Sequence, residues 1–298
     1  MRITVSSPAK INLFLDITGK RSDGYHLINT VMQSVSLYDD VTVSLDEDGS
    51  GIKVSCTDHD IPCDSTNTAY VAAEKFFEYT KLPMQEVNIK IKKRIPSGAG
   101  MAGGSTDAAA VIFALNNLLK AGLSVEEMAE IGEEVGADVP FCIYGGTMSA
   151  SGIGTILSPL PDMPNCNILV VKPEIKISTK EAYEKSDSIG YESIRAADTL
   201  VNAVCNGSVK GIADELYNKF EEVMNIDETE KIKEKMKSFG ALGAVMTGSG
   251  SAVYGIFDNK DDAEDCENVL KDSYDNIYLL HPVTKGPEQT SGGILNLF

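Results

Sequence analysis

The stretch IPSGAGMAGGSTDAAA, residues 95–110, constrains the fold most, because its small residues give way abruptly to the apolar helical run VIFALNNLL. Glycines carry no Cβ, so several backbone N–H groups can turn toward one point and approach a bulky anion closely. Ser105 and Thr106 stand where the helix would begin, with its unpaired amides and the positive end of its dipole facing the loop. The stretch therefore predicts a phosphate-binding loop that leads into a helix.

Other glycine-rich loops fit this stretch less well. The chain contains no G-x-x-x-x-G-K-[ST] sequence, and residues 98–103 match G-x-G-x-x-G only loosely. A dinucleotide-binding unit also needs a βαβ pattern, but a second helix is expected here instead. The simplest alternative is a glycine turn with a Ser/Thr helix cap. Four glycines, the hydroxyl pair and the preceding basic residues favour phosphate; those basic residues are Lys90, Lys92, Lys93 and Arg94.

Composition limits the classes of ligand and partner. The balance of 26 basic and 44 acidic residues gives a net charge of −18, which repels nucleic acid and anionic membranes at long range. The six cysteines lack C-x-x-C spacing, which predicts buried free thiols in a reducing compartment. No apolar leader precedes Pro8, and no run has the length of a membrane span. We therefore expect a globular cytoplasmic protein that holds an anionic ligand through a local site.

Apolar periodicity predicts a mixed α/β chain with two domains. Strands are expected over residues 2–19, 25–37, 40–46, 52–56, 85–93, 167–172, 244–254 (two strands and a turn) and 277–281. Helices are expected over residues 66–79, from 105 through the apolar run, 124–136, 179–186, 190–205, 208–223 and 227–238, and after 261. Three prolines within residues 158–164 predict a linker, so the domains are expected at 1–158 and 165–298.

Two further groups of residues carry candidate chemistry. Alternation along residues 9–17 places Lys10 and Asn12 on the same face of the first strand, opposite the apolar residues. Asp138 lies in the short segment GADVPF after a helix. Taken alone, Lys10 is most simply a solvated lysine and Asp138 a turn aspartate. Together with a phosphate loop they form the minimum set for phosphoryl transfer: a cradle for the donor, a cation and a base.

The motifs SPAKINLFLDITGKRSDGYH, IPSGAGMAGGSTDAAA, GADVPF and TGSGSAVYGIF resemble, in order, those of the galactokinase, homoserine, mevalonate and phosphomevalonate (GHMP) kinase superfamily. The ending GKRSDGYH is similar to the branch that phosphorylates a cytidine diphosphate-linked methylerythritol on the non-mevalonate route to isoprenoid precursors. The resemblance implies a two-domain GHMP kinase fold. Its N-terminal domain would be like ribosomal protein S5 domain 2 and its C-terminal domain ferredoxin-like, with the active site between them.

The resemblance also implies roles for residues that bind the acceptor. Asp138 matches the catalytic aspartate, Lys10 its partner lysine, and Asn12 a residue that orients the acceptor's hydroxyl groups. The cytosine ring would be bound by Tyr25, His26 and Tyr183. In this scheme Tyr25 and Tyr183 stack on opposite faces of the base, and His26 bonds to its edge.

The same resemblance implies ATP as the donor, together with Mg²⁺. Asn67 and Lys93 match positions at the adenine end of ATP. The phosphates would be wrapped by Pro96, Gly98, Gly100, Ala102, Gly103, Gly104, Ser105 and Thr106. A loop hydroxyl is a candidate Mg²⁺ ligand, and its carboxylate ligands stay open. The segment 247–251 either packs near the substrate phosphates or forms a tight hairpin.

Three alternatives remain beside this reading. The first is a kinase of the same fold that acts on homoserine, mevalonate or a sugar, against which the Tyr25-His26 pair argues. The second is a catalytically silent ligand sensor, against which the presence of both Lys10 and Asp138 argues. The third is a nucleic-acid-binding module, which the net charge of −18 disfavours. The expected partners are two small molecules, and the oligomeric state stays open.

Overall fold

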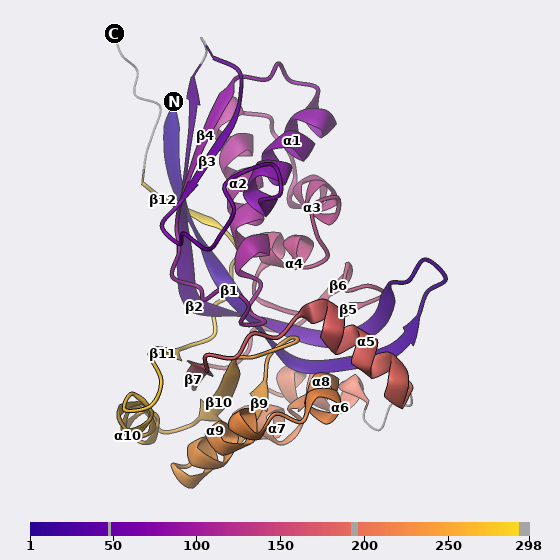
Figure 1. Cartoon of the computed structure of the whole chain (residues 1–298), viewed down its shortest axis with the longest axis vertical. Helices are drawn as coiled ribbons and strands as arrows, with labels where there is room; N and C mark the ends of the chain where they lie inside the picture. The colour runs from indigo at the N-terminus through magenta and orange to yellow at the C-terminus, as the bar shows by residue number, and fades with distance from the viewer. Residues whose placement is uncertain (47–48, 192–195, 292–298) are drawn as a thin grey trace.

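The computed structural model describes residues 1–46, 49–191 and 196–291, and it is built around two long antiparallel strands. Strand β1 (Arg2–Lys20) pairs with β2 (His26–Asp46), and the register shifts after Pro8, Asn12 and Ile17. Such bulges bend a strand pair. Figure 1 shows the pair running down the first sheet and then turning along the second part of the molecule. The separate strands expected over 25–37 and 40–46 are therefore wrong, because β2 is continuous.

The first sheet has the strand order β12-β1-β2-β4-β3, and β5 and β6 extend it beside the first half of β2, where β5 pairs with residues 30–33. Its other strands are β3 (Gly51–Cys56), β4 (Glu86–Lys92), β5 (Thr147–Ser151), β6 (Ile156–Pro159) and β12 (Glu288–Ser291). Four helices cover one face of this sheet (Figure 1): α1 (Thr68–Thr80), α2 (Gly103–Leu119), α3 (Val125–Glu133) and α4 (Val139–Tyr144). Helix α3 begins with a capping box, in which Ser124 and Glu127 bond each other's backbone N–H groups.

The second sheet is antiparallel and has the order β11-β7-β10-β9. Its strands are β7 (Asn167–Lys172), β9 (Gly243–Met246), β10 (Val253–Phe257) and β11 (Asn276–Leu280). The helices of this part are α5 (Thr179–Ile189), α6 (Ala197–Cys205), α7 (Val209–Asp214), α8 (Lys219–Met224), α9 (Asp227–Ser238) and α10 (Lys260–Leu270). With helices after β7 and β10, this is the βαββαβ arrangement, and the ferredoxin-like expectation is confirmed.

The two faces of the second sheet pack on different parts of the molecule. Leu169 and Val253 lie on the face that α9 and α10 cover. Ile168 and Tyr254 point the other way and join a core with Ile11 of β1. Because β1 is covered by the first set of helices at one end and by the second sheet at the other, it is buried over most of its length. The region where the two parts meet therefore lies along β1.

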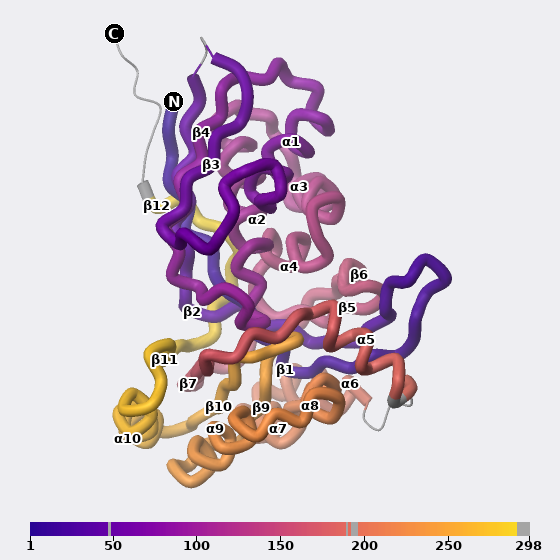
Figure 2. The backbone as a smooth tube through the Cα atoms, in the orientation of Figure 1, coloured from indigo at the N-terminus to yellow at the C-terminus, as the bar shows by residue number. Residues whose placement is uncertain are grey.

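The later part of the chain also contributes strands to the first sheet. The two-residue strand β8 (Tyr217–Asn218) lies parallel to β1, and β12 pairs with the opposite end of β1. Figure 2 shows the yellow tube of β12 beside the indigo tube of β1. The division at residues 158–164 therefore stays a proposal, because residues beyond it complete the first sheet.

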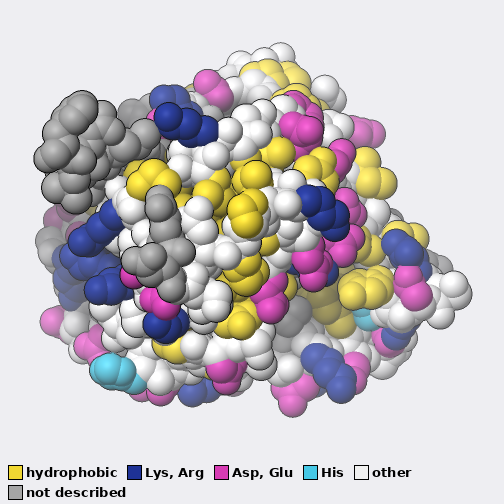
Figure 3. Space-filling view, turned by 90° about the horizontal axis from the view of Figure 1, so that it is seen from above, with side chains coloured by type: hydrophobic (Ala, Val, Ile, Leu, Met, Phe, Trp, Pro, Cys, Tyr) yellow, Lys and Arg dark blue, Asp and Glu magenta, His cyan; other side chains and the backbone are white. Residues whose placement is uncertain are grey.

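Three expectations from composition can be compared with the structure. Among the described residues, no helix has both the length and the apolar character needed to cross a bilayer. All six thiols are free, but only Cys142, Cys166 and Cys266 are buried; Cys63 and Cys205 are exposed, so the expectation of buried thiols is wrong for those two. The third expectation concerns charge, and the face seen in Figure 3 carries acidic and basic side chains together.

Candidate active site

The glycine-rich loop between β4 and α2 has the backbone conformation that its composition predicts. Gly98 and Gly100 have φ angles of +63° and +75°, and Ala102, just before the helix, has +58°. Helix α2 begins without a side-chain cap, so the N–H groups of its first turn keep donor capacity. This loop and the helix start line a cavity of about 500 Å³. The arrangement suits a bound phosphate chain.

The turn at residues 247–251 lies directly against this loop. A Cβ on Gly100 would stand 2.1 Å from the carbonyl oxygen of Thr247, so only glycine permits the approach. The N–H of Ala252 donates to the carbonyl of Ala99 at 3.3 Å. Gly248 and Ser249 also line the cavity. The segment thus forms a tight turn and lies beside the candidate phosphate site, which combines the two alternatives that the sequence leaves open.

Lys10 and Asn12 lie together on β1, and the expectation that they share a face is confirmed. The Lys10 ammonium donates to Oδ1 of Asn12 at 2.7 Å and lies 3.6 Å from Oδ2 of Asp138. The Lys10 side chain is 6% exposed, whereas that of Asp138 is 38% exposed. A buried cation therefore stands behind a carboxylate that opens into the cavity.

The protein uses all hydrogen-bonding groups of Asn12 to hold it. Its backbone N–H donates to the Thr247 hydroxyl at 3.0 Å, and its carbonyl accepts from the Tyr254 hydroxyl at 2.8 Å. Its amide donates to the Thr30 hydroxyl at 2.9 Å, and its Oδ1 accepts from the N–H of Gly248 at 3.1 Å. Asn12 is thus placed to orient Lys10. The sequence analysis gave Thr30 and Tyr254 no role, and it named Thr247 only as part of the segment 247–251.

Asp138 lies where two cavities meet. It immediately precedes α4 and makes no side-chain cap bond to it. The first cavity is lined by the glycine loop. A second cavity of about 560 Å³ adjoins it at Asp138. Both are lined by Ile28, Ser105, Asp138, Thr179 and Tyr183. A donor in the first cavity and an acceptor in the second would meet at this carboxylate.

The second cavity contains the aromatic residues predicted for a base. Tyr25 is 61% exposed at the end of the β1–β2 hairpin. His26 stacks on Tyr183, with ring centroids 4.5 Å apart and planes inclined by 20°. Burial, followed by the negative charge of Asp138, raises the pKa of Tyr183 to about 12. The stacking means that His26 covers one face of the Tyr183 ring, so a base that enters this cavity meets the imidazole as well.

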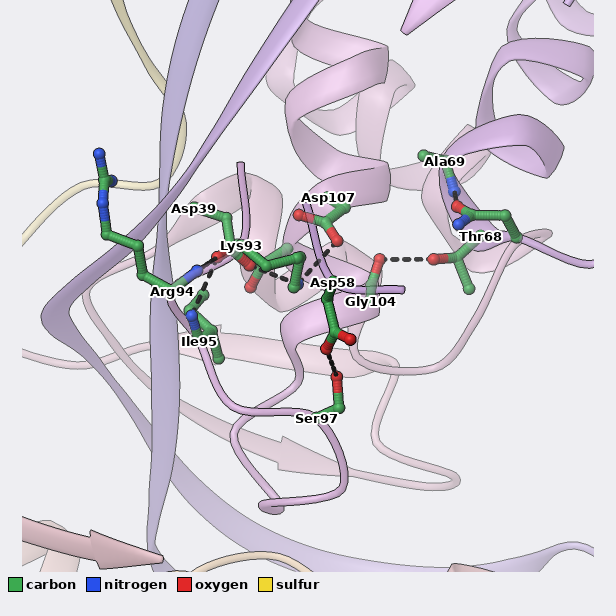
Figure 4. A network of polar contacts seen from close by, with 12 residues as sticks. Asp39, Asp58, Thr68, Ala69, Lys93, Arg94, Ile95, Ser97, Gly104 and Asp107 are labelled. Atoms are coloured by element: carbon green, nitrogen blue, oxygen red, sulfur yellow. Dashed lines mark hydrogen bonds and ion pairs between the residues drawn. The ribbon is translucent and has the colours of Figure 1, made fainter. Parts of the chain in front are cut away.

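The basic run before the loop does not face the candidate phosphates as a group. The ammonium of Lys93 is paired with Asp39 and, at 2.8 Å, with Asp107, and its side chain is 6% exposed (Figure 4). Arg94 forms an ion pair with Asp40, and the neighbouring lysines Lys90 and Lys92 line a separate depression on the sheet. Of these four residues Lys93 alone lines the first cavity, so the expectation that the run faces a phosphate is wrong for Lys90, Lys92 and Arg94 and stays a prediction for Lys93. Lys93 also ties the loop to β2 and α2.

The buried carboxyl of Asp107 has a raised pKa. Burial raises its pKa to about 8; the Lys93 ammonium opposes this effect and the Asp39 carboxylate reinforces it. Asp39 also accepts from the backbone N–H groups of Arg94 and Ile95, at 2.6 and 2.9 Å (Figure 4). This network fixes the start of the glycine loop.

Other predicted nucleotide contacts lie at different places. Asn67 lines the first cavity, but it also caps α1 by accepting from the N–H of Ala69 at 2.9 Å. Ser105 lines both cavities. Thr106 is buried, and its hydroxyl donates to the carbonyl of Pro8 at 3.1 Å. The structure therefore does not place this hydroxyl at a phosphate. The remaining predicted loop residues line the first cavity: Lys93, Pro96, Gly98, Gly100, Ala102, Gly103 and Gly104.

No cluster of three or more His, Cys, Asp or Glu side chains that could hold a metal occurs within residues 1–46, 49–191 and 196–291. A Mg²⁺ ion that arrives with nucleotide phosphates needs only one or two protein ligands. The hydroxyl of Ser105, on the wall that the two cavities share, is suited to that use.

Known proteins resemble this chain in sequence and in fold. Residues 67–146 match the family model of the GHMP kinases N-terminal domain, and residues 200–276 match that of the GHMP kinases C-terminal domain. A protein of Thermoanaerobacter pseudethanolicus named 4-diphosphocytidyl-2-C-methyl-D-erythritol kinase is 43% identical over 96% of this chain and 98% of its own. A protein of the same name from Caldicellulosiruptor saccharolyticus is 45% identical over 88% and 91%.

Solved structures of GHMP kinases share the fold of this chain. The crystal structure of a 4-(cytidine 5'-diphospho)-2C-methyl-D-erythritol kinase superposes with a TM-score of 0.78 at 29% identity, covering 95% of this chain and 99% of the other. The homoserine kinase of Cytophaga hutchinsonii superposes with a TM-score of 0.79 at 20% identity over 97% of each chain. At that identity the second likeness concerns the fold alone.

Proposed function

This chain belongs to the 4-diphosphocytidyl-2-C-methyl-D-erythritol kinase family of GHMP kinases, and we propose that it transfers the γ-phosphoryl group of ATP to the 2-hydroxyl of 4-diphosphocytidyl-2-C-methyl-D-erythritol. One observation carries the assignment of the site: two cavities meet at Asp138, with the Lys10 ammonium 3.6 Å behind its carboxylate. We assign the first cavity to ATP and the second to the cytidine substrate.

In this reaction the bond between the γ-phosphorus and the ADP oxygen breaks, and a bond from the acceptor oxygen to that phosphorus forms. The Asp138 carboxylate accepts the proton of the attacking hydroxyl, acting as the general base. The Lys10 ammonium faces both Asp138 and Asn12, so its positive charge orients the Asp138 carboxylate and stabilises negative charge that develops on the attacking oxygen. The amides of residues 98–104 and the start of α2 bind the transferred and departing phosphate oxygens.

A Mg²⁺ ion bound with ATP neutralises charge on the β- and γ-phosphates. In this chain the Ser105 hydroxyl is the group that we expect to hold it, directly or through water. We further propose a cytoplasmic enzyme, in agreement with its free cysteines, and two small-molecule ligands without a nucleic-acid partner, in agreement with the net charge of −18.

A test of the proposed function is ADP release by the purified protein with ATP and Mg²⁺. Three acceptors are compared: 4-diphosphocytidyl-2-C-methyl-D-erythritol, homoserine and mevalonate. We expect turnover with the cytidine compound only. Turnover with another alcohol would retain the kinase and refute the assigned acceptor; no turnover with any acceptor, alongside measurable ATP binding, would favour a ligand sensor.

A further inference from the structure

Helix α5 contacts the end of the β1–β2 hairpin through two side chains one turn apart. Tyr183 stacks on the imidazole of His26, and Asp187 contacts its Nε2 at 2.6 Å. Lys20 donates to the other oxygen of Asp187 at 2.5 Å, and the Tyr191 hydroxyl donates at 2.5 Å to the oxygen that His26 contacts. The imidazole is thus held on one face and on one edge, and the His26 side chain is 9% exposed.

The contact with Asp187 determines where His26 carries its hydrogen. Hydrogen bonds from Lys20, then Tyr191 and His26, hold the pKa of the Asp187 carboxyl well below its usual range, so this group only accepts. Nε2 of His26 must therefore donate. In the neutral ring the hydrogen is then absent from Nδ1, which becomes an acceptor. Among the described residues, no hydrogen-bond partner of this Nδ1 is found.

His26 lines the second cavity, together with Tyr25, Lys20 and Ile153. A ring nitrogen that accepts can bind the 4-amino group of cytosine, which is a donor. It repels the 4-carbonyl oxygen of uracil, which is an acceptor in the same position. The polarity of this one nitrogen therefore distinguishes two bases of nearly equal shape.

We propose that Asp187 is a positioning residue that sets the base specificity of the second cavity, by holding His26 with its hydrogen on Nε2 and Nδ1 free to accept from the amino group of a cytosine ring. The proposal rests on the proposed function for the nature of the acceptor. It adds a residue that does not itself line either cavity and acts only through His26.

The experiment measures binding of CDP and UDP to the intact protein by calorimetry, which does not depend on turnover. We expect the wild-type protein to bind CDP about 10- to 100-fold more tightly than UDP, since a mismatched buried acceptor leaves its partner unsatisfied. In Asp187→Ala the His26 imidazole loses its fixed tautomer, and the ratio of CDP affinity to UDP affinity should fall to within about threefold of unity. Asp187→Asn preserves the shape but can turn its amide N–H toward Nε2, so the ratio should fall there too.

Controls separate positioning from support of the fold. Glu181→Ala removes one negative charge from an exposed site on the same helix and should leave the ratio unchanged. A role of Asp187 in stability alone would weaken CDP and UDP binding by the same factor. An unchanged ratio in both Asp187 variants, or equal binding of CDP and UDP by the wild-type protein, would overturn the proposal. The acceptor assay fails independently if the proposed function is wrong.

Discussion

Replacement of Gly100 by alanine should force the phosphate loop away from the turn at residues 247–251. The added Cβ would stand 2.1 Å from the Thr247 carbonyl oxygen and 2.9 Å from the carbonyl carbon. Both atoms belong to the backbone, so the turn itself must move. The same Thr247 accepts from the N–H of Asn12, and the movement should therefore reach the site of Lys10.

The size of the effect follows from comparison with Gly98. Both glycines have positive φ angles, +75° for Gly100 and +63° for Gly98, a conformation that costs an L-residue about 1–2 kcal/mol. A Cβ on Gly98 would meet nothing within 4 Å. Only Gly100→Ala therefore adds overlap with packed atoms, at about 1–3 kcal/mol. With an unfolding entropy of about 2.1 cal/mol/K per residue, that excess lowers Tm by about 2–5 °C in a chain of 298 residues.

The assay is thermal unfolding of the two alanine variants, accompanied by the KM for ATP. We expect Gly100→Ala to unfold about 2–5 °C below Gly98→Ala and to show the larger rise in KM. Both variants share the backbone strain, so the difference isolates the close approach of loop and turn. Equal Tm values would refute the reasoning, because the Thr247 carbonyl would then have no part in holding Gly100.

Two other predictions concern carboxylates. Asp138→Asn removes the base with little change of shape, so turnover should fall by about 10²-fold or more while calorimetry still detects ATP binding; unchanged turnover would remove Asp138 from the mechanism. The pKa of Asp107, about 8, lies above its ordinary value of 3.8, so the folded state binds this proton more tightly and the associated stability is lost as pH rises through 8. Asp107→Asn cannot titrate, so between pH 5 and pH 9 its free energy of unfolding should fall by at least about 1 kcal/mol less than that of the wild-type protein. The measurement is Tm at each pH. Parallel curves of Tm against pH for the two proteins would contradict this prediction.

Local patterns predicted the parts of the site that depend on local backbone geometry. The glycine loop was recognisable because positive φ angles and close approach require residues without a Cβ. Lys10 and Asn12 were placed together because side chains two apart share a face of a strand, and their 2.7 Å contact confirms it. Strand β7 was predicted with its observed bounds for a similar reason, since it is a continuous apolar run between turn residues.

Contacts between distant segments could not be predicted in this way. Thr247 binds Asn12 across 235 positions, and the sequence marked the segment 247–251 but not this contact. Lys93 was counted among the basic residues that favour a phosphate, but Asp39 pairs with it from 54 positions away. The strands expected over 25–37 and 40–46 left Asp39 between them, yet Asp39 is buried within β2 because Lys93 and two backbone N–H groups compensate its charge.

The pairing of β12 with β1 has a consequence for the order of folding. Thr4 lies opposite Ser291, so one edge of the first sheet is completed by residues 287 positions further along the chain. During synthesis β1 must therefore present unpaired backbone groups along this edge until the second sheet has been translated. Such long-range pairing is slow to form. A nascent chain that has been translated only as far as the linker thus has the whole glycine loop but an open edge on its first sheet.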